Sequence, residues 1–268
     1  MPPRARAAED RGQVAEGKPL ILAALGARGT GKSAWTKDQL DHVLKPSRLV
    51  VWDLMQEYAH VAQTDRLGDA IRAMRKARFR VAFMPSRDDK VRARQFDVWC
   101  DAVMQAGNCT AVVEELAFVT RPSWAPRGWR EMVLLGRHPK HRVSIIGTSQ
   151  RPAQVDKEFL GNADLIHCGR LAHATDAKVI ADLMGVSAQT IQTMPDLDYV
   201  ERRAGACNPT RGRLKFRAPA PAPKPTRAGS LGPDPKDGNS TPARAMGTLA
   251  AFDLAQLGDT QPNLEESA

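Results

Sequence analysis

The sequence predicts an α/β fold in which a mostly parallel sheet carries helices on both faces. Short apolar runs alternate along the chain with polar segments of helical character, a pattern typical of parallel strands joined by crossover helices. One run, residues 20–25, leads directly into a glycine-rich turn, and another, residues 110–113, ends in two adjacent carboxylates. Strands buried on both faces have this continuous apolar character, so both runs are expected inside the sheet.

The glycine-rich turn matches G-x-x-x-x-G-K-[ST] at every fixed position, and residues 33–40 after it are expected to form a helix. The glycines let the backbone curl around a polyphosphate, and the helix N-terminus adds partial positive charge. The lysine reaches the β- and γ-phosphates, and the next hydroxyl ligates Mg²⁺. The pattern therefore predicts a P-loop with ATP and Mg²⁺ as its ligands. The residues expected to bind the nucleotide are Gly26, Ala27, Arg28, Gly29, Thr30, Gly31, Lys32 and Ser33.

An acidic pair, Glu114 and Glu115, ends the apolar run over residues 110–113. It follows the P-loop by about 80 residues, and P-loop enzymes place a carboxylate for the metal and one for water at a strand end. We assign Glu114, with Ser33, to Mg²⁺ and Glu115 to the attacking water. The metal position more often carries Asp, so the order of the two roles stays open.

The strand expected over residues 143–150 also ends in polar residues. Gln150, at its end, is predicted to reach the γ-phosphate or the lytic water. Such a sensor belongs to a RecA-like ATPase with an extra strand between the P-loop strand and the acidic strand. A simple strand-to-loop transition is the alternative.

The remaining pattern completes the predicted fold. Further strands are expected over residues 48–53, 79–84 and 165–171, and an edge hairpin from 198–202 and 212–216. Further helices are expected over residues 69–75, 90–105, 130–138, 176–184 and 187–193.

Three segments follow from the change in composition along the chain. Residues 1–17 are polar and charged and are expected to form a flexible arm. Residues 18–217 carry the predicted strands and helices and form the expected ATPase motor domain. Residues 218–268 are rich in proline, glycine and serine, which predicts a largely disordered tail.

Composition limits the class of protein further. Hydrophobic residues make up 42% of the chain, which allows a substantial core, yet the mean hydropathy is −0.40. No apolar run approaches the roughly 20 residues that span a bilayer, and the N-terminus lacks the apolar stretch of a secretory signal. The four cysteines form no C-x-x-C pair and are expected to be reduced thiols. These features predict a cytoplasmic location, or an assembly made there.

The charge is unevenly divided. The last 51 residues hold 4 Lys and Arg against 6 Asp and Glu, a net charge of −2. Since the whole chain has a net charge of +9, residues 1–217 have a net charge of +11. A basic body favours a polyanionic partner such as nucleic acid. An ordinary solvated basic surface is the alternative.

Several motifs together resemble the FtsK/HerA superfamily of DNA-pumping ATPases. They are the P-loop GARGTGKS, the stretch VVWDLMQEYAH, the strand AVVEEL and the segment LLGRHPKHRVSIIGTSQRPAQVD. In that superfamily a helix ends in Gly-Arg, a buried strand follows, and a Thr/Ser-Gln-Arg-Pro segment closes it. Here these are Gly136-Arg137 and residues 149–152. The resemblance covers residues 19–171, and the compact chain is similar to the genome-packaging ATPases of tailless, membrane-containing bacteriophages.

The resemblance implies a homo-oligomeric ring, commonly a hexamer, that moves double-stranded DNA without regard to sequence. ATP then lies between neighbouring subunits, and an arginine from the adjacent subunit completes the site. The family position matches Arg137, and Arg151 and Arg121 are alternatives. A packaging enzyme of this kind works in the host cytoplasm or at the packaging vertex, where a capsid vertex or portal protein is a possible partner.

Three alternatives to a packaging motor remain. A related conjugation or filamentous-phage export ATPase shares the same motifs. A small-molecule kinase predicts an arginine-rich lid over an acceptor, which Glu114, Glu115 and Gln150 do not favour, since they suit water activation. A nucleotide-switch adaptor does not need Lys32, Ser33 and Glu115 together.

Overall fold

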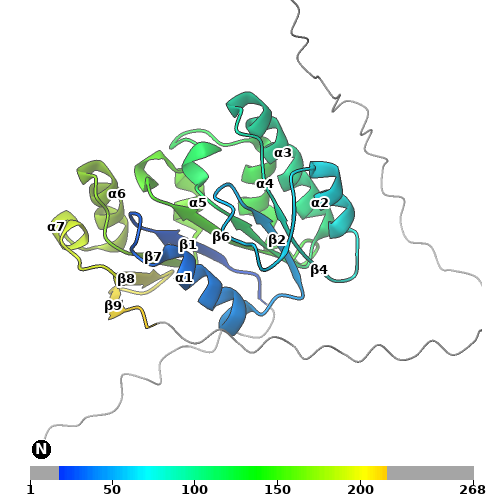
Figure 1. Ribbon diagram of the computed structural model, residues 1–268. Coiled ribbons are helices and arrows are strands. Elements are labelled where there is room, and N and C mark those ends of the chain that lie inside the picture. The colour runs from blue at the N-terminus through cyan, green and yellow to red at the C-terminus, as the bar shows by residue number, and fades with distance from the viewer. Residues whose placement is uncertain (1–17, 216–268) are drawn as a thin grey trace, which may run out of the picture. The chain divides into compact units, whose positions relative to one another are not determined.

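The computed structural model describes residues 18–215. Within them, nine strands form one sheet in the order β3-β4-β2-β5-β6-β1-β7-β8-β9 (Figure 1). The strands from β3 to β7 in this order pair in parallel, and β8 and β9 add an antiparallel hairpin at one edge. The mostly parallel sheet predicted from the sequence is confirmed. The strands are β1 Ile21–Leu25, β2 Arg48–Trp52, β3 Ala62–Thr64, β4 Phe79–Phe83, β5 Cys109–Val113, β6 Val143–Ser149, β7 Leu165–Cys168, β8 Asp198–Arg203 and β9 Thr210–Arg213.

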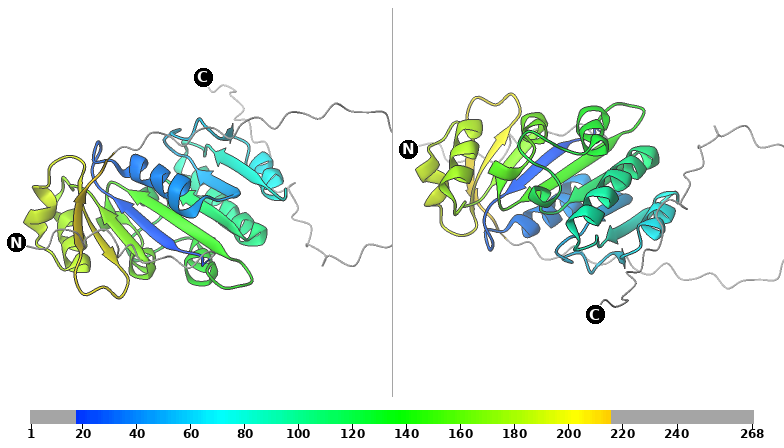
Figure 2. Two further views of the ribbon diagram at one scale, coloured as in Figure 1. Left: turned by 90° about the horizontal axis from the view of Figure 1, so that it is seen from below. Right: turned by 90° about the horizontal axis from the view of Figure 1, so that it is seen from above.

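Helices cover both faces of the sheet, but unequally. Side chains of α2 to α7 join one large buried cluster on one face, whereas α1 and the π-helix after it cover the other. Figure 2 shows α1 on the opposite side of the sheet from α3, α4 and α5. The helices are α1 Lys32–Asp38, α2 Leu67–Met74, α3 Asp89–Ala106, α4 Arg127–Leu135, α5 Lys157–Asn162, α6 Ala174–Met184 and α7 Ala188–Gln192, with the π-helix Gln39–Leu44 and 3-10 turns Leu116–Phe118 and Pro152–Gln154.

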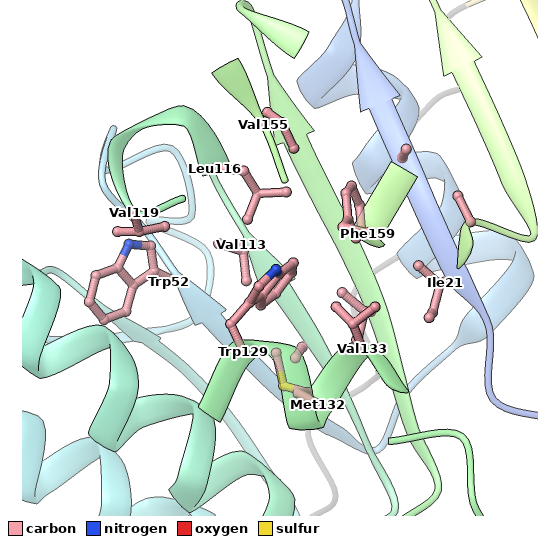
Figure 3. Close-up of a cluster of buried hydrophobic side chains, with 14 of the residues drawn as sticks. Ile21, Trp52, Val113, Leu116, Val119, Trp129, Met132, Val133, Val155 and Phe159 are labelled. Carbon is pink, nitrogen blue, oxygen red and sulfur yellow. The ribbon is translucent and has the colours of Figure 1, made fainter. Parts of the chain in front are cut away.

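The larger cluster fixes the loop that follows β5. Leu116 and Val119 are buried in the same cluster as Trp129 and Phe159, and Figure 3 shows Val119 next to Trp52. Gly147 of β6 makes room for this packing, because a Cβ at that position would lie 2.5 Å from Leu116 and 2.5 Å from Phe159. Truncating a buried aromatic side chain to alanine typically costs about 3–5 kcal/mol. The carboxylates at the end of β5 therefore stand on a rigid, well-packed support.

Most predicted elements are present with shifted bounds. The acidic strand, the sensor strand and the helix capped by Asp88 agree closely with expectation, and β6 lies between β1 and β5 as predicted. The helix expected over residues 130–138 begins earlier, at Arg127, and ends at Leu135. The sequence analysis missed α5 and the short strand β3. Asp156 caps α5 by accepting hydrogen bonds from the backbone of Glu158 and Phe159.

Some predictions lie outside the described residues. The arm over residues 1–17 and the tail over 218–268 are among them, and so are their boundaries. Within residues 18–215, no helix combines the length and the apolar character needed to cross a bilayer.

Candidate nucleotide site

The P-loop lies at the C-terminal ends of the neighbouring parallel strands β1, β6 and β7. Gly26 donates its backbone N–H to Ser149 O of β6 at 3.2 Å, and Ala27 donates to Arg170 O after β7 at 2.7 Å. Gly29 and Gly31 have φ of 81° and 94°, a left-handed conformation that glycine adopts without strain. The turn is thus anchored to both neighbours of β1, and Lys32 begins α1 directly after it.

A pocket opens beside this turn. Its lining combines the P-loop with the ends of β2, β5 and β6 and with the segment before β8. The lining residues are Arg28, Gly29, Gly31, Lys32, Ser33, Ala34, Met55, Glu57, Glu114, Glu115, Thr148, Gln150 and Leu197. The fold therefore brings the predicted P-loop, acidic pair and sensor residue to one place.

Lys32, together with the exposed Arg28, supplies positive charge to this pocket. Its Nζ donates to Ala27 O at 3.2 Å, so the side chain folds back over the P-loop. Burial lowers the pKa of Lys32, while the carboxylates of Glu115, Glu57 and Glu114 oppose that shift. The arrangement holds a positive charge opposite the acidic pair, at the position where a phosphate chain needs it.

Glu115 is held by Gln150 through two hydrogen bonds. Its Oε1 accepts from Gln150 Nε2 at 3.0 Å and its Oε2 accepts from the Gln150 backbone N–H at 3.1 Å. The backbone N–H of Glu115 in turn donates to Thr148 Oγ1 at 3.2 Å. Glu115 also has a left-handed φ of 51°, uncommon for a side chain of this size. Strain of this kind collects at functional sites, and here it directs the carboxylate into the pocket.

Glu114 is almost fully buried, and its Oε2 has no hydrogen-bond partner among the described residues. Burial raises the pKa of Glu114 to about 9, and the nearby Asp53 and Glu57 add to the shift. Asp53 is itself buried and accepts the backbone N–H groups of Glu57 and Tyr58 at 2.8 and 3.1 Å. A carboxyl group with an unsatisfied oxygen, crowded by other acids, is a position that a divalent cation would stabilise.

The donor set suits Mg²⁺ in particular. Ser33 and Glu114 line the same pocket, and Mg²⁺ usually takes one or two protein oxygens, with phosphates and water completing its shell. Among residues 18–215 no group of three or more His, Cys, Asp or Glu side chains forms a self-sufficient metal centre. The residues present fit a cation that arrives with a nucleotide.

Sequence reasoning missed several lining residues. Thr148 orients the Glu115 backbone, and Glu57 contributes negative charge beside Lys32. Thr148 is a polar residue at the end of a buried strand, which is the signal that had already singled out Gln150. Leu197 had no local signal at all, because its place beside the P-loop depends on the hairpin.

The three candidate arginines do not line this pocket of their own chain. Arg137 lies at the other ends of the strands, before β6 begins. There its Nη1 contacts both oxygens of Asp164, which precedes β7, at 2.9 and 3.1 Å. Arg151 follows Gln150 in the chain, but its Nε turns to Asp176 at 2.8 Å. Arg121 is exposed and donates to the backbone carbonyls of Ala117 and Thr120. A role for Arg137 toward a neighbouring subunit stays a prediction.

The sheet order and the pocket define the fold of the P-loop NTPases, and comparison with known proteins supports this. No family model matches the chain. Protein P9 of Pseudoalteromonas phage PM2 is 27% identical to it over 177 residues, which cover 65% of this chain and 78% of that protein.

Two solved structures show the fold likeness. The genome-packaging NTPase B204 of Sulfolobus turreted icosahedral virus 2, in complex with AMPPCP, has a TM-score of 0.59 and 16% identity, over 72% of this chain and 97% of that one. The bacterial conjugative coupling protein TrwBdeltaN70 has a TM-score of 0.53 and 12% identity, over 76% and 87%. The resemblance to DNA-pumping ATPases seen in the sequence is thus confirmed at the level of the fold.

Proposed function

We propose that this protein is an ATP-driven translocase of double-stranded DNA that packages a viral genome into a preformed capsid. The observation that carries the proposal is the Glu115 carboxylate, held by Gln150 in the same pocket as Lys32. A carboxylate so placed suits removal of a proton from water, which is hydrolysis rather than transfer to an acceptor. The fold likeness to a viral genome-packaging NTPase and to a conjugative coupling protein supports DNA as the load.

In ATP hydrolysis, each polar residue of the pocket is proposed to have a distinct role. Lys32 and the P-loop backbone bind the β- and γ-phosphates, and Glu115 accepts a proton as water oxygen bonds to the γ-phosphorus. The bond from that phosphorus to the β–γ bridging oxygen breaks, releasing ADP and inorganic phosphate. Gln150 fixes the Glu115 carboxylate and so orients the water. Ser33 and Glu114 are the residues that would hold Mg²⁺, which neutralises charge on the phosphate oxygens when bound.

DNA is proposed as a partner because the body of the protein is basic, with +11 on residues 1–217. Contacts go to the phosphate backbone, since a translocase must accept every sequence. The ring, proposed as a hexamer, works in the host cytoplasm or at the packaging vertex, where a capsid vertex or portal protein receives it. Co-sedimentation of the protein with empty procapsids checks this last point.

The trans role of Arg137 belongs to the same proposal. Arg137 lies at the N-terminal ends of the strands and the pocket at their C-terminal ends, so Arg137 cannot reach the pocket of its own subunit. Activity therefore needs a neighbouring subunit and rises steeply with protein concentration. Arg137→Ala is expected to bind ATP and assemble, yet to lose about 10³-fold or more in turnover, as arginine fingers do elsewhere. Mixing it with the inactive Lys32→Ala restores partial activity where an intact P-loop meets an intact arginine.

Loss of the ion pair with Asp164 is the competing explanation, since Asp164 also accepts the Ile21 backbone N–H at 2.8 Å. Asp164→Asn is the matched control: it weakens the pair and leaves the arginine in place. Equal loss in both variants, together with a lower melting temperature, assigns Arg137 to structure, and Arg121 and Arg151 are then tested in the same way.

The proposed activity is tested by displacement of a triplex-forming oligonucleotide from linear duplex DNA. The protein with ATP is expected to displace it, whereas Glu115→Gln and the protein with AMPPCP are not. ATP turnover that transfers phosphate to a small molecule, with no release of inorganic phosphate, would favour the kinase alternative. Nucleotide binding without turnover would favour the adaptor.

A further inference from the structure

Two leucines flank the edge hairpin and meet at the P-loop. Leu197 immediately precedes β8 and Leu214 immediately follows β9, and the Leu214 backbone N–H donates to Leu197 O at 2.8 Å. A Cβ built on Gly31 would lie 2.4 Å from Leu214 Cδ1 and 3.3 Å from Leu197 Cδ2. Both side chains therefore lie directly against the backbone of the P-loop, and Leu197 also lines the pocket.

The backbone of Leu197 is unusual for its residue type. Its φ is 70°, in the left-handed region that glycine and asparagine favour and leucine avoids. Such a conformation persists only where the surrounding contacts determine it, and it collects at functional sites. Because an asparagine or glycine fits this backbone better, a leucine here indicates that the apolar side chain itself is needed.

A hydrogen-bonded cluster holds the hairpin against the P-loop helix. Glu201 of β8 accepts from Trp35 Nε1 of α1 at 2.9 Å, and His167 Nδ1 of β7 lies 2.9 Å from the same oxygen. The rings of Trp35 and His167 stack with their centroids 4.7 Å apart. These contacts fix the position of β8, and with it Leu197, relative to α1 and the P-loop.

The sheet order gives the direction in which a nucleotide lies. Glu115 and Gln150 come from β5 and β6, on one side of β1, and the hairpin leucines come from the other side, beyond β7. The γ-phosphate must face Glu115 and Gln150 for hydrolysis, so the nucleoside end of the ligand points toward the hairpin.

We propose that Leu197, backed by Leu214, forms an apolar platform for the base of the bound nucleoside triphosphate. This inference rests on the proposed function, because it requires the pocket to bind a nucleoside triphosphate. The P-loop and the segment before the hairpin contribute Arg28, Gly29, Gly31 and Leu197 to the described lining. Arg28 is the only one of these four whose side chain carries hydrogen-bonding groups, and it is exposed. Leu197 therefore holds a purine by apolar contact, and that contact by itself discriminates weakly between adenine and guanine.

Substitutions that keep the left-handed backbone test the platform. Leu197→Asn and Leu197→Gly both suit φ of 70°, so they remove the apolar surface without adding strain. Binding of AMPPCP is expected to weaken by about 10-fold, since several buried methyl and methylene groups are lost. Binding of inorganic tripolyphosphate, which has no base, is expected to stay unchanged. Leu134→Asn, at an exposed position on α4, is the matched control and leaves both affinities unchanged.

Calorimetric titration of each variant with AMPPCP distinguishes a failure of the proposed nucleotide site from a failure of the platform alone. If Lys32→Ala binds AMPPCP as well as the unchanged protein does, the P-loop is not the nucleotide site and the proposed function fails. If Lys32→Ala loses binding while Leu197→Asn and Leu197→Gly bind AMPPCP normally, the platform alone is overturned.

Weak base selection is tested with GMPPCP. The Kd values for GMPPCP and AMPPCP are expected to agree within about 3-fold, because Leu197 has no hydrogen-bonding group to distinguish the two bases and Arg28 is exposed. A preference of more than about 100-fold for either one would require a hydrogen-bonding group at the base and would overturn this part of the inference.

Discussion

The two sides of β1 build opposite halves of one pocket. On the β5–β6 side the lining is polar. Glu114 and Glu115 are buried, Gln150 is half-buried and donates to Glu115, and the buried Asp53 lies near Glu114. On the hairpin side Leu197 lies against Gly31 of the P-loop and adds an apolar side chain to the lining.

The charged half is costly for the folded state. Burial raises the pKa of Glu114 to about 9 and leaves its Oε2 without a partner, which is expensive in a packed interior. On the hairpin side, Trp35 and His167 both contact the Glu201 carboxylate, while His167 Nε2 is buried without a hydrogen-bond partner among the described residues. The difference lies in the charges around each buried carboxyl group: Glu114 is crowded by other acids, whereas Glu201 faces Trp35 and His167.

The largest expected effect comes from Glu115→Gln on the charged side. Turnover is expected to fall by about 10³-fold or more because the proton acceptor is lost, while the affinity for AMPPCP stays within about 3-fold. Steady-state phosphate release and calorimetric titration measure the two quantities. Glu131→Gln, on the exposed side of α4, controls for a change of charge. Normal turnover in Glu115→Gln would transfer the role to Glu114.

Removing the partner of Glu115 is expected to have a smaller effect. Gln150→Ala leaves the carboxylate in place but no longer orients it, so kcat is expected to fall about 10–100-fold with little change in KM. Gln154→Ala, an exposed glutamine four residues later, is the matched control. A large rise in KM with unchanged kcat would show that Gln150 binds nucleotide and does not position Glu115.

Local sequence was sufficient to predict the charged half of the pocket. The P-loop, the acidic pair and Gln150 each stand at the end of an apolar run, and the ends of neighbouring parallel strands meet at one edge. The structure places all of them around one pocket. Asp53 was recognised as a strand end, but its burial beside Glu114 depends on β2 and β5 being neighbours, which no local pattern encodes.

The hairpin half could not be predicted, because its contacts join distant parts of the chain. Trp35 and Glu201 are separated by 166 positions, and neither has a neighbour in sequence that indicates the other. Arg137 illustrates the same limit. The motif predicted its position before β6, but its contact with Asp164, which directly precedes β7, depends on the fold.

A moderate effect is expected on the hairpin side from Trp35→Phe. The change keeps the aromatic stack on His167 but removes the hydrogen bond to Glu201, which should cost about 1 kcal/mol of unfolding free energy. Urea unfolding measures the loss, and turnover at saturating ATP should change little. An unchanged unfolding free energy would show that this bond adds nothing to the attachment of the hairpin.

The smallest expected effect is a pH dependence of stability. Burial lowers the pKa of His167, against the opposing influence of Glu201. Below the ordinary histidine pKa of about 6.5 the unfolded chain binds a proton that the folded chain resists, so stability falls as the pH drops from 7 toward 5. His167→Gln is expected to flatten this slope, by at most about 1.4 kcal/mol per pH unit. A slope unchanged by the substitution would assign the dependence to other groups.

The central claim is that hydrolysis drives movement along DNA, and one measurement tests it most directly. The rate of ATP hydrolysis is compared with and without long linear double-stranded DNA, at low and high salt. The account predicts stimulation of several-fold or more by DNA, independent of its sequence and lost as salt rises, because the contacts go to phosphates. Turnover that depends on Glu115 but is the same with and without DNA at every salt concentration would contradict the claim.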